Sequence, residues 1–205
     1  MDKSKRLPFI AVSREAGSGG KLIAKMVAQK LGFKFYDEGL IDLVAKTAHK
    51  RKRVIVALDE REREFIDDLV HRLLNPEYVS AQTYIKSLVQ VIQALALKGG
   101  IVILGRGANF VVERHAGLNV RVIAPYLVRV GYTMKYEKRS KEDAQYRIKK
   151  YDRERKEFVR QFFGKDPSNT NYYDVVINTE QTSIEQAVEM ILEAYRQKFK
   201  GVRLV

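Results

Sequence analysis

Small residues gather near the start of the chain in a pattern suited to binding an anion. They follow a short apolar run, Phe9–Val12, which predicts a buried strand. After Ser13, Arg14 and Glu15 come Ala16, Gly17, Ser18, Gly19 and Gly20. Glycines let consecutive backbone N–H groups point at one anion, and a helix that begins there adds a partial positive charge. A helical pattern follows at once and ends at Gly32, so we predict that Ala16 to Lys21 bind phosphate; an ordinary glycine-rich turn is the alternative.

The loop departs from the usual phosphate-binding pattern G-x-x-x-x-G-K-[ST], and two alignments are open. If Gly19 is the second glycine, Arg14 replaces the first glycine and Gly20 replaces the lysine. Lys21 then stands where the pattern has its hydroxyl. If Gly20-Lys21 is instead the glycine–lysine pair, the first glycine and the hydroxyl are both missing. The lysine normally neutralises the β- and γ-phosphates and the hydroxyl binds Mg²⁺, so we expect Lys21 and Arg14 to replace the lost cation.

A third arginine lies at a position where ligands commonly bind. Arg106 stands between Gly105 and Gly107, directly after the strand-like run Ile101–Leu104. Ligands of open parallel sheets bind beyond the carboxyl ends of the strands, and the guanidinium fork suits a phosphate. We therefore predict that Arg106 contacts a phosphate, the alternative being an ordinary surface arginine.

Two more arginines fall in a strongly basic helical pattern at 147–163. Arg155 interrupts its apolar stripe, which consists of Ile148, Tyr151, Phe158 and Phe162. Burying an unpaired guanidinium is costly, so Arg155 needs an anionic partner. Two interpretations are open. Either Arg155 pairs with Asp152 and Arg153 is solvated, or Arg153 and Arg155 belong to a lid that closes over phosphates.

Strand-like and helical patterns alternate along the chain. The strand-like runs are Phe9–Val12, Phe33–Tyr36, Ile101–Leu104, Val120–Ala124 and Val175–Ile177. The helical patterns are Leu22–Leu31, Leu40–Ala48, Phe65–Leu74, Tyr84–Leu95, a long stretch from Ala124 to about Phe163, and a last helix capped by Thr182 with Glu185. This alternation predicts an α/β protein with a parallel sheet and helices on both faces. We expect a single domain over 1–205, with a helical insertion at about 38–98 and a lid-like segment at about 140–165.

The composition excludes several kinds of chemistry. The 205 residues include no cysteine, which rules out disulfides, thiolate catalysis and cysteine zinc sites. His49, His71 and His115 are too far apart in sequence to suggest a metal site, and none is expected. No apolar run is long enough to cross a membrane or to form a secretory signal, so we expect a cytoplasmic protein without a membrane partner.

The net charge of +13 favours polyanionic partners. Basic residues concentrate at Lys46–Arg53 and Arg129–Lys165. Such runs are usually solvated faces, and no nucleic-acid-reading motif accompanies them, which makes nucleic acid the less favoured partner. The apolar stripe at Phe65–Leu74 fits a monomer core or a homodimer contact equally well.

With these pieces in order, the chain resembles the cytidylate-kinase-like family of nucleoside monophosphate kinases over about residues 8 to 200. The segments that carry the resemblance are Ile10–Glu15, Phe35–Asp37, Ile103–Asn109, Asp152–Arg155 and Tyr173–Thr179. The resemblance implies a five-stranded P-loop kinase core of three layers, with a nucleotide-binding insertion and a lid. It implies transfer of the γ-phosphoryl group of ATP, with Mg²⁺, to a pyrimidine monophosphate such as CMP. It also implies acceptor contacts at Asp37 and Arg106.

The chain differs from true cytidylate kinases at these same segments. Their Gly-Arg-Asp becomes Gly105-Arg106-Gly107, and a family arginine falls near Leu43. The spacing from the loop to Leu31-Gly32 favours the alignment that puts Gly20 at the lysine position. Three functions follow in order of preference: a kinase with an altered loop, a nucleotide sensor that has lost turnover, and a nucleic-acid-binding protein on a kinase core.

Overall fold

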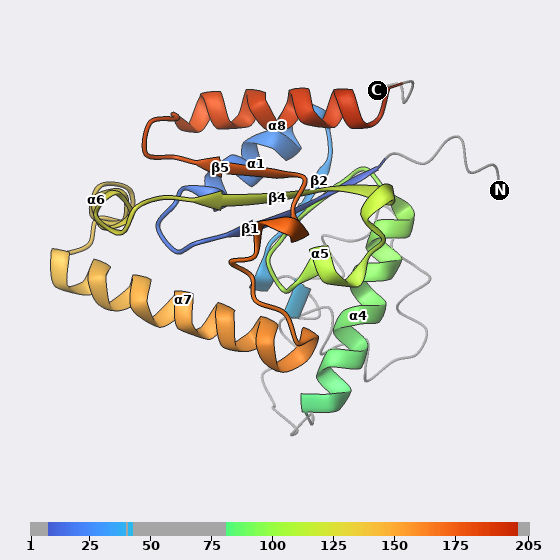
Figure 1. Cartoon of the computed structure of the whole chain (residues 1–205), viewed down its shortest axis with the longest axis horizontal. Helices are drawn as coiled ribbons and strands as arrows, with labels where there is room; N and C mark the ends of the chain where they lie inside the picture. Colours follow the sequence, from blue (N-terminus) through green and yellow to red (C-terminus); the bar gives the residue numbers. More distant parts are fainter. Residues whose placement is uncertain (1–7, 40, 43–80, 201–205) are drawn as a thin grey trace, which may run out of the picture.

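The computed structural model describes residues 8–39, 41–42 and 81–200. Its centre is a five-stranded sheet in the order β2-β3-β1-β4-β5, and every strand pair is parallel. The strands are β1 (Phe9–Arg14), β2 (Lys34–Tyr36), β3 (Ile101–Leu104), β4 (Gly117–Ile123) and β5 (Val175–Asn178). Parallel strands need crossover connections, which here are helices, so the predicted α/β architecture is confirmed (Figure 1).

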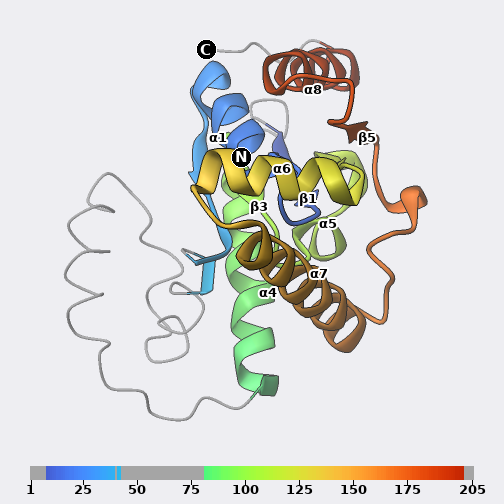
Figure 2. The same ribbon diagram turned by 90° about the vertical axis from the view of Figure 1, so that its left-hand side faces the viewer.

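Helices cover both faces of the sheet (Figures 1 and 2). On one face, α1 (Gly20–Leu31) and α8 (Ile184–Lys198) pack on the side chains of Ile10, Val12 and Val120. On the other face, α4 (Ala81–Lys98) and the short α5 (Ala108–Val111) pack on Phe9, Ala11 and Ile103. Alternate residues of β1 thus enter opposite cores, which explains why Phe9–Val12 is apolar throughout.

Two further helices close the edge of the sheet at which the strands end. They are α6 (Tyr126–Glu137) and α7 (Lys141–Phe163). Figure 2 shows α6 crossing this edge, with α1 and α8 on one side and α4 and α7 on the other. A small apolar cluster of Ala16, Val130, Ala144 and Ile148 joins both helices to the loop after β1. The glycine-rich loop is therefore held between β1, α1 and these two helices.

The structure corrects two details of the predicted helices. The long stretch from Ala124 to Phe163 is two helices, because Lys138 has a left-handed backbone (φ 53°) and Ser140 caps a new start by accepting from the Asp143 N–H. The last helix is capped by Ser183 with Gln186, one residue later than predicted. The Ser183 hydroxyl accepts from the Gln186 N–H at 3.2 Å, and the Gln186 side chain accepts from the Ser183 N–H at 2.9 Å.

Several expectations fall on residues outside the described part of the chain. These are the helix at Phe65–Leu74 with its dimer alternative, most of Leu40–Ala48, the basic run Lys46–Arg53, Leu43, His49 and His71. Among the described residues, none of the helices is both long and apolar enough to span a bilayer.

Candidate active site

The glycine-rich loop is tightly bonded to the ends of the neighbouring strands. The Ser18 hydroxyl is fully buried, and its one O–H lies within hydrogen-bond distance of the carbonyl oxygens of Glu15 (2.9 Å) and Val122 (3.2 Å). The Thr179 hydroxyl donates to the Ser18 carbonyl at 3.0 Å from the end of β5. Gly17 has a φ of +78°, and a side chain there would lie 2.7 Å from the Arg129 carbonyl of α6. The loop can therefore approach α6 only because residue 17 is glycine.

Arg14 fills the space beside Gly20. A β-carbon at Gly20 would lie 2.6 Å from Cβ of Arg14, and one at Gly105 would lie 2.3 Å from its Nη1. The Arg14 side chain thus passes between two glycines, and only 7% of it is exposed. In the alignment with Gly20 at the lysine position, a lysine stem would collide with Arg14, so the two substitutions compensate sterically.

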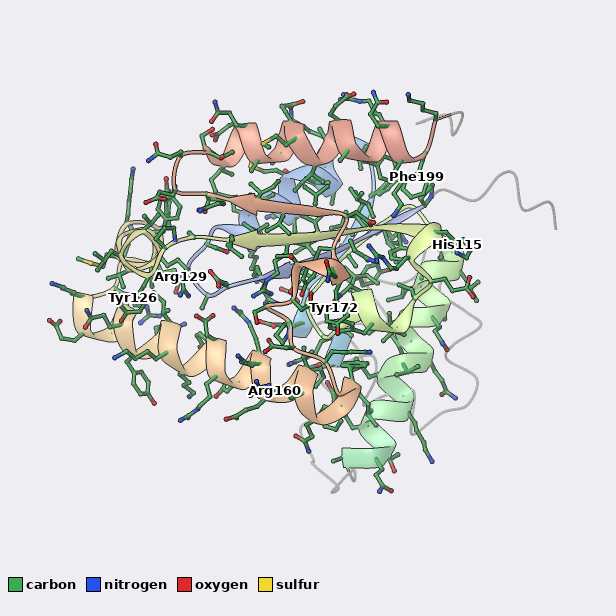
Figure 3. The ribbon with its side chains drawn as sticks, viewed as in Figure 1. His115, Tyr126, Arg129, Arg160, Tyr172 and Phe199 are labelled. Atoms are coloured by element: carbon green, nitrogen blue, oxygen red, sulfur yellow. The ribbon has the colours of Figure 1, made fainter. Side chains whose placement is uncertain are left out.

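A carboxylate from α7 occupies one N–H of the loop. Asp152 Oδ1 accepts from the Ala16 N–H at 2.8 Å, and Asp152 Oδ2 accepts from Arg129 Nη1. Arg129 also donates to the Ala16 carbonyl at 3.1 Å and lies 3.6 Å from Glu15 Oε2. Figure 3 shows Arg129 where α6 meets the loop that follows β1. Asp152 and Arg129 therefore fasten both helices to the loop.

Two cavities open beside this loop. The first, about 190 Å³, lies beyond the ends of β1, β3 and β4. Its polar lining includes Ser13, Arg106, Asn109, Arg121, Lys156 and Asp166. The second, about 250 Å³, lies over the glycine loop, and its lining includes Gly17, Gly19, Gly20, Lys21, Tyr132 and Tyr136. Arg14, Glu15, Glu38 and Arg155 line both cavities, and we call these four the shared wall.

Opposite charges meet in the shared wall. Glu38 lies 2.7 Å from Arg14 Nη2 and 3.5 Å from Arg155 Nη2. Burial and the nearby charge of Arg155 lower the pKa of Arg14 to about 10, against the opposing effect of Glu38. Burial alone would raise the pKa of Glu38, but the charges of Arg14 and Arg155 hold it below its usual value. Arg14 and Glu38 are therefore both charged at neutral pH. Arg155 Nη1 is buried and has no hydrogen-bond partner among the described residues.

Arg106 is already neutralised. It has a left-handed backbone (φ 51°) and forms a two-pronged ion pair with Asp42, which also accepts from the Tyr84 hydroxyl at 2.6 Å. Burial lowers the pKa of Arg106, but the hydrogen bonds and charge of Asp42 outweigh this and raise it. Its guanidinium lies 5.1 Å from the Phe158 ring centre and lines the first cavity. A phosphate would have to share Arg106 with Asp42.

The other site residues expected from the sequence are Lys21, Asp37 and Arg153, and they differ in whether they reach the two cavities. Lys21 lines the second cavity, is 68% exposed, and pairs at 2.8 Å with Asp37, the expected acceptor contact. Arg153 lines neither cavity; it is 72% exposed and lies 3.9 Å from Glu157. The structure thus brings Arg14, Arg106, Arg155 and the loop together, and leaves Arg153 outside.

The Asp152–Arg155 pair considered from the sequence is wrong. Asp152 turns to Arg129 and the loop, while Arg155 turns to Glu38 and lies 5.8 Å from the Tyr151 ring centre. Both partners come from elements that helical periodicity within 147–163 cannot reveal. Arg121 and Arg129 were also missed, although each is an arginine in a largely apolar run, which is the same signal that singled out Arg155.

No side-chain cluster suited to a metal is formed by the described residues. They contain no group of three or more His, Asp or Glu side chains that could hold a metal ion. The position of the usual Mg²⁺-binding hydroxyl is Lys21, and the Ser18 hydroxyl is used within the loop. His115 is exposed and lies 3.1 Å from Glu113 at the start of β4, away from the loop (Figure 3).

The strand order and the glycine loop between β1 and α1 define the P-loop kinase fold. The profile of the cytidylate kinase-like family matches residues 9–181, and the chain belongs to that family. It is 29% identical over 195 residues to the cytidylate kinase of Archaeoglobus fulgidus, covering 92% of this chain and 95% of that one. It is also 29% identical over 186 residues to the cytidylate kinase of Pyrococcus horikoshii, covering 90% and 86%.

Two other matches support less: one shows only the fold, and the other covers only part of each chain. A solved structure of an uncharacterized protein from Eubacterium ventriosum superposes with a TM-score of 0.71 at 21% identity, covering 92% of this chain and 98% of that one. This likeness shows the fold. The chain is also 32% identical over 105 residues to the uronate isomerase of Corynebacterium glutamicum, but this match spans 51% of the chain and only 20% of the isomerase.

Proposed function

We propose that this protein is a phosphotransferase that moves the γ-phosphoryl group of ATP to a small anionic acceptor, with a nucleoside monophosphate such as CMP as the first candidate. The observation that carries the proposal is the shared wall. The second cavity adjoins the glycine loop, the first lies at the strand ends, and Arg14 and Arg155 border both.

Phosphoryl transfer needs positioning and stabilisation of charge more than covalent chemistry. A donor in the second cavity would place its phosphates against Gly17–Lys21, and an acceptor in the first would reach the same wall from the other side. The buried N–H groups on Arg155 Nη1 lack an acceptor here, and an oxygen of the transferring group would supply one. Arg14 would take over the charge of the missing loop lysine.

The second cavity has a lining suited to a nucleotide donor. Tyr132 and Tyr136 form an edge-to-face pair with ring centres 5.7 Å apart, and both line this cavity together with Leu22 and Ile184. Aromatic and aliphatic groups beside a phosphate-binding loop are what a nucleobase next to its phosphates requires.

The family implies Mg²⁺ in addition to ATP. The described residues do not present the usual hydroxyl and carboxylate ligands, since residue 21 is lysine and Asp152 is bound to Arg129 and Ala16. We therefore assign none of the described residues to Mg²⁺.

The experiment is transfer of label from [γ-³²P]ATP in the presence of Mg²⁺ to CMP, UMP, dCMP, AMP and GMP in separate reactions. We expect labelled nucleoside diphosphate in at least one reaction. An Arg155→Lys variant purified in the same way controls for contaminating kinases and should be at least about tenfold slower, because an ammonium cannot replace the fork. Nucleotide binding without any transfer would contradict the proposal and favour the sensor alternative.

A further inference from the structure

We propose that Arg121, on β4, binds an anionic oxygen group that the acceptor already carries, a phosphate or a carboxylate. The identification of this ligand as the acceptor rests on the proposed function. The anion site itself is independent of phosphoryl transfer and can be tested without a nucleotide.

Arg121 is a buried guanidinium that has no anionic partner in the described part of the chain. It is 8% exposed and lines the first cavity. It donates from Nη1 to the neutral Ser13 hydroxyl at 2.8 Å and lies 5.6 Å from the Tyr173 ring centre. No carboxylate among the described residues forms an ion pair with it. Burying a guanidinium without an opposite charge is unfavourable, so an anion bound there would relieve a cost that the empty site carries.

The other cations of the first cavity differ from Arg121 in this respect. Arg14 and Arg155 share Glu38, Arg106 is bound by Asp42, and Lys156 lies 3.5 Å from Asp166. An incoming anion would have to compete with a carboxylate at each of them. At Arg121 it would compete with none, which makes this residue a stronger candidate for the acceptor's anion than Arg106.

Besides Glu38, which pairs with Arg14 and Arg155, the carboxylates of the same cavity are bonded to other groups. Asp152 is bound by Arg129 and Ala16, and Glu15 accepts from the Ala124 N–H at 3.1 Å. Asp166 accepts from both the backbone N–H and the hydroxyl of Ser168. They are therefore not competing ion-pair partners of Arg121.

Neutral hydrogen-bond donors lie in the same cavity. Asn109 is 9% exposed, lines the cavity, and has a buried Nδ2 without a partner. Ser13 accepts from Arg121, so its own O–H can be donated. An unpartnered amide donor and a hydroxyl beside a charge-unpaired guanidinium are the components of a site for a phosphate or carboxylate group.

The site has a consequence for the choice of acceptor. An acceptor with its own phosphate or carboxylate would satisfy Arg121, whereas a neutral nucleoside or sugar would leave the guanidinium buried and unpaired. We infer that neutral acceptors are rejected, and that in a nucleoside monophosphate the anionic group held by Arg121 is the same phosphate that receives the phosphoryl group.

The direct test is diffraction from crystals of the full chain soaked in selenate, an anomalous scatterer of the same shape and charge type as phosphate. We expect a peak within hydrogen-bond distance of the Arg121 guanidinium. A saturating soak without a peak beside Arg121 would overturn the proposal.

The test in solution is a calorimetric titration of inorganic phosphate into the wild type, Arg121→Gln and Arg196→Gln. Arg196 is the matched control, because it is an exposed arginine of α8 on the opposite face of the sheet. Arg121→Gln keeps a donor for Ser13 but loses the charge, and should bind about 10- to 100-fold more weakly, while Arg196→Gln should match the wild type. If Arg121→Gln does not fold, Ser13→Ala removes one donor, and we expect it to bind phosphate several-fold more weakly.

Parallel titration with acetate separates the two sources of the anion. Binding of phosphate alone would assign a phosphate monoester, and binding of both would extend the class to carboxylates. Equal phosphate affinity of the wild type and a folded Arg121→Gln or Ser13→Ala would contradict the proposal. Phosphate binding at Arg121 in a protein that transfers no phosphoryl group would refute the proposed function and leave this site standing.

Discussion

Arg14 and Gly20 lie side by side at the glycine-rich loop, and the arginine side chain fits there only because residue 20 has no side chain. A β-carbon at Gly20 would lie 2.6 Å from Cβ of Arg14. In the usual phosphate-binding loop the first of these positions is glycine and the second is lysine. This chain has the cation at the first position and the glycine at the second, so the loop retains a cation that enters from the end of β1.

This exchange predicts the behaviour of a variant series. Gly20→Lys alone should lower the melting temperature and should not raise phosphoryl transfer, because its stem meets Arg14. Arg14→Gly should remove the cation and slow transfer. The double variant Arg14→Gly/Gly20→Lys restores the usual arrangement and should transfer at least about tenfold faster than Arg14→Gly alone. A double variant no faster than Arg14→Gly would show that the two positions are unrelated in function.

Substitutions at Arg155 and Arg153 test whether these two arginines of α7 contact phosphates. Arg155→Lys should keep the melting temperature of the wild type and lose turnover, because the fork that reaches both cavities is gone. Arg153→Lys should change neither quantity, because this side chain is 72% exposed and lines no cavity. Steady-state kinetics and thermal melts on both variants suffice. Loss of turnover in Arg153→Lys would instead support a lid in which Arg153 also contacts phosphates.

Asp152 should be coupled energetically to Arg129. Asp152→Asn loses the charge that Arg129 faces, and we expect the free energy of unfolding to fall by about 1–3 kcal/mol. A double-mutant cycle of Asp152→Asn with Arg129→Gln should show a coupling energy of at least about 0.5 kcal/mol, and the cycle with Arg155→Gln should show almost none. Urea unfolding provides these values. The reverse pattern would support the Asp152–Arg155 pair.

The lowered pKa of Glu38 predicts that its contribution to the free energy of unfolding is lost in acid. Its folded pKa is lowered below 4.5, so its contribution is present above that value and is lost as the pH falls through the folded pKa. Glu38→Gln should therefore be less stable than the wild type at pH 7, and the difference should shrink toward pH 3. Glu154→Gln, at an exposed position of α7, controls for loss of a carboxyl group. A difference that stays constant with pH would contradict a charged Glu38.

The sequence predicted the sheet well because its strands are short, largely apolar runs that alternate with helical patterns. All five strand positions, the loop between β1 and α1, and the family are confirmed. Site pairings were harder to predict, because Glu38, Arg129 and Asp42 meet their partners across elements that are distant in sequence. Periodicity showed that Arg155 needs an anion, but it could point only to the nearest carboxylate on the same helix, Asp152.

In the proposed reaction, donor and acceptor meet at the shared wall. The most direct measurement is a crystal structure of the full chain with Mg²⁺, a non-hydrolysable ATP analogue and CMP. We predict the triphosphate along Gly17–Lys21, with its terminal phosphate within hydrogen-bond distance of Arg14 and Arg155. A triphosphate bound elsewhere, or a terminal phosphate that touches neither arginine, would show that donor and acceptor do not meet at the shared wall.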